Sequence, residues 1–143
     1  MVGDEKFGLF MELEGPAEIE ISNSVVTLDG DDLTGFEFDF NEQTILRMNS
    51  NSIVDTSLAA NDDNRGIFID RIGQGSTFQF ENNAITMLGD DARGLEIDAF
   101  GVINLIDTSP GNLITIGPFG DFAFDFDGAT PNGQLLINGV FVP

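Results

Sequence analysis

The stretch GDDARGLEID at 89–98 decides the fold, because related stretches recur along the whole chain. They read GDEKFGLFME at 3–12, GDDLTGFEFD at 30–39, NDDNRGIFID at 61–70 and GDFAFDF at 120–126. The acids Glu12, Asp39, Asp70, Asp98 and Asp125 mark the repeat at intervals of 27, 31, 28 and 27 residues. A period of this length predicts a solenoid or another repeat array.

A column of asparagines recurs out of phase with these acids, at intervals of 28, 32, 29 and 26 residues. Asparagine tolerates the left-handed backbone of a tight corner, and its amide can hydrogen-bond to the same residue in neighbouring repeats. The column therefore predicts a structural ladder, with a carbohydrate or ligand contact as the alternative. Its members are Asn23, Asn51, Asn83, Asn112 and Asn138.

Each repeat contains three short apolar segments separated by turn residues. SVVTL at 24–28, FEFDF at 36–40 and ILRMN at 45–49 are examples of the three types. They are rich in Ile, Val and Phe, many have apolar residues two positions apart, and glycine or Asn-Asp pairs punctuate them. No window has a helical period of useful length. The sequence therefore predicts a nearly all-β protein.

A stack of coils, with one repeat in each coil, explains the repeat interval. Three strands cannot close a domain alone, but coiling the chain once per repeat stacks equivalent strands in parallel and builds continuous apolar columns. We therefore predict an all-β, right-handed parallel β-helix with three-strand coils of about 28 residues and roughly four and a half coils. It forms a single domain over residues 1–143, interpreted as a segment of a longer repetitive protein. An antiparallel sandwich also fits short strands, but it gives no reason for a repeated decapeptide.

One glycine occupies the same place in four repeats, where the motif enters its strand. It is expected to relieve crowding at a bend that leaves no room for a Cβ atom. The predicted stack contains Gly8, Gly35, Gly66 and Gly94.

Composition excludes several classes of function. With 25 acidic and five basic residues the formal net charge is -20, which disfavours nucleic acid and anionic lipid as partners. The chain has no Cys, His, Trp or Tyr, so a disulfide scaffold, a thiolate zinc site and a Ser-His-Asp triad are excluded. No apolar run reaches the roughly 18 residues of a spanning helix, and membrane insertion is not expected. A secretion signal, if the protein is exported, lies outside this chain.

Pairs of aspartates recur with the coil period and are the candidate metal ligands. Calcium prefers several oxygen ligands, which corners rich in Asp, Asn and carbonyl groups can supply. The alternative is a solvated acidic corner, and the nonapeptide of calcium-binding β-rolls is absent. Arg65 and Arg93 share one repeat position beside these pairs and are expected to pair with stacked carboxylates. The candidate calcium ligands are Asp31, Asp32, Asp62, Asp63, Asp90 and Asp91, and no other cofactor is expected.

The three-part repeat, with its asparagine corner and its strand of the form Gly-apolar-x-apolar-Asp, resembles the pectate-lyase-like right-handed β-helix superfamily. It is most similar to the repeats of autotransporter passengers and large bacterial surface proteins. This resemblance implies an extracellular or cell-surface location and a structural or adhesive role. The polygalacturonase-like members carry a histidine and an Arg-x-Lys element, and neither occurs here. We therefore expect no enzyme; the alternative is a carbohydrate-binding or polysaccharide-degrading module with a groove on one strand face.

The expected partners follow from the outward residues and from the ends. Phe10 and Phe68 fall on the outward phase of their segments and mark either a contact face or local packing. Neither end carries an obvious cap, so further β-helix coils or end-to-end self-association are predicted. A glycan or protein on a host or cell surface is the other expected partner.

Overall fold

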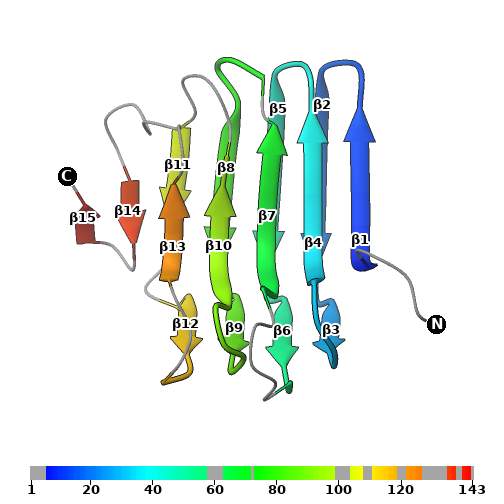
Figure 1. Cartoon of the computed structure of the whole chain (residues 1–143). Helices are drawn as coiled ribbons and strands as arrows, with labels where there is room; N and C mark the ends of the chain where they lie inside the picture. The colour runs from blue at the N-terminus through cyan, green and yellow to red at the C-terminus, as the bar shows by residue number, and fades with distance from the viewer. Residues whose placement is uncertain are drawn as a thin grey trace.

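The chain forms a stack of short strands, which Figure 1 shows as successive layers from β1 to β13. The computed structural model describes residues 6–57, 63–71, 73–98, 104–107, 111–118, 122–126, 135–137 and 140–142. These residues form strands, turns and bends, and none of them is helical. Accordingly, the described part of the chain contains no helix that could cross a membrane.

Three parallel sheets form the walls of the stack. The first sheet holds β1 (Lys6–Leu13), β4 (Leu33–Phe40), β7 (Arg65–Arg71), β10 (Arg93–Ile97) and β13 (Phe122–Phe126). The second sheet holds β2 (Ala17–Ser22), β5 (Thr44–Asn49), β8 (Thr77–Glu81) and β11 (Asn104–Asp107). The third sheet holds β3 (Val25–Leu28), β6 (Ser52–Asp55), β9 (Ala84–Met87) and β12 (Leu113–Ile116).

The chain visits the three sheets in turn and advances by one strand with each circuit. In Figure 1 it rises along β4 on the near side, crosses the top to β5, continues through β6 and rises again along β7, one place to the left. This winding is right-handed, as expected from crossover handedness. The prediction of a parallel β-helix is confirmed.

Residues at equivalent positions of successive repeats lie beside each other on adjacent strands. Leu95 lies beside Ile67 in the first sheet, and Ile67 lies beside Phe36. Equivalent residues of successive repeats therefore stack directly, about 4.8 Å apart. The β4–β7 pair shifts register after Phe38, so that Asp39 lies beside Arg71. The register shift therefore separates Asp39 from Asp70, whereas the inward residues Phe36 and Phe38 keep their places beside Ile67 and Ile69.

The core lies between the three sheets and consists of stacked apolar columns. Inward positions alternate with outward ones along each strand, because successive side chains point to opposite faces. The largest fully buried side chains are Phe38, Phe40, Phe78, Leu46, Met48, Ile53, Ile67, Ile69, Ile85, Met87 and Leu95. Each such side chain contributes about 1.5–3 kcal/mol of hydrophobic stabilisation.

The predicted number of coils is wrong. About three coils are complete among the described residues, with strands, corners and inward side chains, rather than roughly four and a half. At the C-terminal end β14 (Leu135–Ile137) and β15 (Val140–Val142) pair with each other in antiparallel fashion. The sequence between them is Asn138-Gly139, and Asn-Gly is the dipeptide most typical of two-residue hairpins. The antiparallel pairing of β14 and β15 departs from the parallel pairing of the coils.

The first coil leaves the core columns partly open. Leu9, Met11 and Ile19 are half-buried, whereas the equivalent side chains in the next coil are buried. β1, β2 and β3 each end their sheet in the order of strands. Among the described residues no further strand pairs with this edge, which places backbone groups beside apolar side chains as a template for another strand.

Candidate functional site

An asparagine ladder stabilises the corner between the second and third sheets. Asn51 and Asn83 donate from Nδ2 to Oδ1 of the next asparagine, at 2.9 Å to Asn83 and 3.2 Å to Asn112. Backbone N–H groups of Asn51 and Asn83 donate to the same oxygens at 3.0 and 2.8 Å. All three residues are buried. The ladder provides hydrogen-bond partners for the buried polar groups of the corner. Because these side chains are buried, they are inaccessible to a ligand.

One of the predicted ladder residues, Asn23, does not belong to this ladder. Asn23 is exposed and has a φ of 54°. Its neighbour Ser24 takes the ladder position instead and donates its N–H to Oδ1 of Asn51 at 3.1 Å. Asn23 corresponds to Ser50 and Asn82, which also have positive φ, so it forms the left-handed turn residue before the ladder. The predicted member Asn138 lies outside the described residues.

The predicted glycine stack lies where the first and third sheets approach each other. A Cβ atom on Gly35 would lie 2.5 Å from the carbonyl oxygen of Gly66 and 3.0 Å from Cγ2 of Ile53. A Cβ on Gly66 would lie 2.5 Å from the carbonyl oxygen of Gly94. Gly8 and Gly94 are equally crowded. The glycines are therefore required by close approach, and none of the four has a positive φ.

The aspartate pairs form turns that lead into the first sheet. Asp32, Asp63 and Asp91 have φ values of 55°, 43° and 57°, a conformation that aspartate tolerates better than most residues. Asp31 is exposed and Asp90 is half-buried, while Asp62 lies outside the described residues. No cluster of three or more Asp or Glu among the described residues is arranged to hold a metal ion. Calcium binding at these pairs stays a prediction.

A buried carboxylate at the corner after β6 was missed by the sequence analysis. Asp55 is fully buried, and its Oδ1 accepts hydrogen bonds from the N–H and hydroxyl of Ser57 at 3.0 and 2.9 Å. Its Oδ2 accepts the N–H of Gly89 at 2.9 Å. Asn64 donates to Asp55 at 3.2 Å and accepts the N–H of Leu33 at 2.7 Å. The inward phase of Asp55, two residues after Ile53, was the available signal.

The outer face of the first sheet carries the exposed aromatic and charged side chains. One row across the strands reads Phe10, Glu37, Phe68, Glu96 and Asp125. The row before it begins with Phe7, which is 38% exposed and contacts Phe10 with ring centroids 5.4 Å apart. Phe10 is 47% exposed. Aromatic rings and carboxylates therefore lie beside each other on the outward face of this sheet.

Two arginines neutralise part of this face. Nε of Arg65 lies 2.6 Å from Glu96, and its guanidinium lies 4.9 Å from the centroid of the Phe68 ring. Arg93 lies 3.4 Å from Asp63, 3.3 Å from Asp125 and 3.9 Å from Glu96. Both arginines therefore pair with carboxylates of neighbouring strands and turns, and one of these carboxylates, Asp63, belongs to an aspartate pair.

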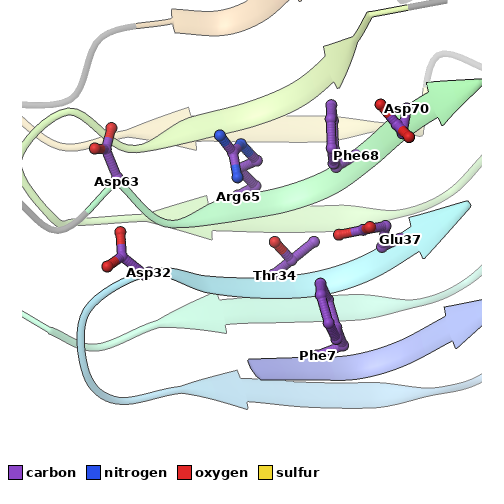
Figure 2. A pocket seen from close by; sticks show the side chains of 8 residues that line it. All are labelled: Phe7, Asp32, Thr34, Glu37, Asp63, Arg65, Phe68 and Asp70. Atoms are coloured by element: carbon purple, nitrogen blue, oxygen red, sulfur yellow. The ribbon is translucent and has the colours of Figure 1, made fainter. Parts of the chain in front are cut away.

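A groove with a volume of about 500 Å³ lies on this face, and Figure 2 shows the side chains that line it. Phe7 and Phe68 stand up from β1 and β7, and Asp32 and Asp63 lie together at the turn end of the groove. The described residues that line it are Phe7, Asp32, Thr34, Glu37, Asp63, Arg65, Phe68 and Asp70. These side chains can accept hydrogen bonds, attract cations and stack on flat or apolar groups.

Comparisons with known proteins identify no relative. No protein-family model, curated protein or solved structure matches the chain. Function is therefore inferred from the corners and from the outer face of the first sheet.

Proposed function

We propose that the chain is a non-catalytic structural or adhesive segment of an exported bacterial surface protein. The observation that carries this proposal is that the residues shared by the repeats have structural roles. They are the buried asparagines, the crowded glycines and the inward apolar pairs, all of which build coils. A catalytic site needs one constellation, whereas this chain repeats its polar groups once per coil. Repetition therefore favours a scaffold that presents a surface.

The proposal places the chain with the β-helical passengers of surface proteins. A parallel β-solenoid with three sheets, stacked asparagines and crowded glycines supports this kinship with the pectate-lyase-like superfamily. An extracellular or cell-surface location follows from that kinship. The half-open first coil supports an additional role for the edge of β1, β2 and β3 in contacting further coils or a second copy.

A second candidate function is carbohydrate binding in the groove on the first sheet. The observation that favours it is the combination of Phe7 and Phe68 with four carboxylates on one concave surface. Aromatic faces pack on the apolar faces of sugar rings, and carboxylates accept hydrogen bonds from hydroxyl groups. Degradation of a polysaccharide would further require one protonated and one ionised carboxyl group at a set separation.

Two assays test these functions. Antibodies raised against the purified chain should label intact cells of the producing organism; labelling only after permeabilisation would contradict the surface role. The chain is also incubated with a panel of neutral and acidic polysaccharides, and new reducing ends are measured. We expect none. Reducing ends that disappear in a Glu37→Gln variant would overturn the non-catalytic proposal, whereas binding without cleavage would support the second candidate.

A further inference from the structure

The geometry points to a specific partner chemistry: we propose that the outer face of the first sheet binds arginine-rich segments of another protein. Guanidinium groups stack on the exposed Phe7–Phe10 pair and approach the neighbouring carboxylate Glu37. This inference deepens the proposed adhesive role and rests on it. It concerns the outward face of the first sheet, where Phe7 and Phe10 lie on the edge strand β1.

The molecule already contains one guanidinium site of this kind. Arg65 places its guanidinium 4.9 Å from the ring centroid of Phe68 and pairs at 2.6 Å with Glu96, which lies beside Phe68 on the next strand. Aromatic rings attract cations through their negative faces, and a carboxylate binds the same group through charge-assisted hydrogen bonds. A ring followed by a carboxylate on the adjacent strand is therefore a guanidinium receptor on this face.

The same pair of residues recurs two coils earlier. Phe10 lies beside Glu37 on the next strand, as Phe68 lies beside Glu96. The residue three positions before Phe68 is Arg65, and the residue three positions before Phe10 is Phe7. The earlier receptor therefore has a second ring, 5.4 Å away between centroids, in place of the internal arginine. Both rings are substantially exposed, which leaves room for a cation from outside.

Charge favours a basic partner over other partners. The groove beside these rings contains four carboxylates and one guanidinium, which leaves three formal negative charges. The whole chain has a formal net charge of -20 and attracts cations over the range of a Debye length. An apolar partner would leave the carboxylates desolvated, and an anionic partner would be repelled. The partner must pack on the aromatic rings and also neutralise the carboxylates. Arginine does both, because its flat guanidinium stacks on rings and pairs with carboxylates.

A binding assay with matched variants tests the proposal. A fluorescein-labelled hexa-arginine peptide is titrated with the folded chain, and anisotropy gives the dissociation constant. Phe10→Ala should weaken binding about two- to fivefold, as expected for one exposed cation–π contact. Val25→Ala is the control, because Val25 is 76% exposed but lies on the third sheet. Glu37→Gln should likewise weaken binding more than Glu20→Gln, which removes a charge from the second sheet.

A gain-of-binding variant completes the test. Arg65→Ala vacates the receptor formed by Phe68 and Glu96, and the peptide should then bind more tightly than it binds the wild-type chain. Equal effects of Phe10→Ala and Val25→Ala, together with equal effects of the two glutamate variants, would overturn the proposal and leave only diffuse charge attraction. If Arg65→Ala fails to fold, as judged by circular dichroism, the Phe10 and Glu37 comparisons still decide. Surface labelling of cells without peptide binding would reject this inference and leave the adhesive role standing.

Discussion

Replacing Asn83 with alanine should remove the middle rung of the asparagine ladder and destabilise the whole stack. The Asn83 side chain is 1% exposed. Its Oδ1 accepts from the N–H and Nδ2 of Asn51 at 3.0 and 2.9 Å, and its Nδ2 donates to the Met48 carbonyl at 2.9 Å and to Asn112 at 3.2 Å. Alanine can make none of these four hydrogen bonds.

The expected loss is about 4 kcal/mol of unfolding free energy. The buried N–H of Asn51 loses its acceptor, which costs about 1–3 kcal/mol, and each of the other lost hydrogen bonds contributes about 0.5–1.5 kcal/mol. This loss is a large fraction of the about 5–15 kcal/mol that stabilises a typical domain. It corresponds to a fall in melting temperature of about 10 °C for a chain of this size.

Urea denaturation followed by far-ultraviolet circular dichroism measures the effect, with Asn23→Gly as the matched control. Asn23 is exposed and has a φ of 54°, a conformation that glycine adopts without strain. Its replacement should change the unfolding free energy by less than about 1 kcal/mol. If Asn83→Ala and Asn23→Gly differ by less than about 1 kcal/mol, the ladder does not stabilise the corner as argued.

Further predictions concern the other repeated features. Gly66→Ala should lower the free energy of unfolding by about 1–3 kcal/mol, because the new Cβ would lie 2.5 Å from a carbonyl oxygen. In Gly15→Ala the new Cβ meets no atom within 4 Å, so this control should leave the melting temperature unchanged. Asp55→Ala should lower the urea midpoint by the equivalent of about 3 kcal/mol, because buried donors lose their acceptor; an unchanged midpoint would contradict the role assigned to this carboxylate. Ile97→Asp buries a charge and should abolish the cooperative thermal transition, while Thr27→Asp on the exposed side of β3 should retain it. If the aspartate pairs bind calcium, EDTA at constant ionic strength should lower the melting temperature and sodium chloride should not restore it; an unchanged melting temperature would favour the solvated acidic corner.

The repeat made the architecture predictable, because in a solenoid equivalent positions of successive repeats lie on adjacent strands. The apolar pairs of the motif, such as Leu95 and Ile97, lie inward and stack on Ile67 and Ile69 as the period-two pattern predicts. The crowding of Gly94 was predictable for the same reason. Local features that repeat with the coil are thus accessible from a single sequence.

The polar residues of the corner and the C-terminal strand pair were harder to predict. The corner contains two adjacent polar columns, a left-handed turn residue and a ladder residue, and asparagine suits both. Asn23 was therefore assigned to the wrong column, although Ser24 takes the ladder position. The hairpin of β14 and β15 was missed because Asn138 fitted the asparagine spacing while also forming an Asn-Gly turn signal.

Contacts between side chains on the outer face were the least predictable part of the candidate site. Outward phase alone suggests that Glu96 is free to change. The structure instead pairs it with Arg65 at 2.6 Å and with Arg93 at 3.9 Å. The receptor-like arrangement of Phe68 and Glu96 around Arg65 likewise depends on the register between β7 and β10. Such contacts require the exact alignment of strands, which a repeat interval gives only approximately.

Proton–proton contacts between strands test most directly the central claim that each repeat builds one parallel coil. In an isotope-labelled sample, nuclear Overhauser contacts between backbone protons should join the neighbourhoods of Phe36 and Ile67, of Ile67 and Leu95, and of Leu46 and Phe78. These pairs belong to adjacent parallel strands about 4.8 Å apart. Contacts that instead join β3 to β4 or β4 to β5 as antiparallel hairpins would indicate a sandwich and contradict the account.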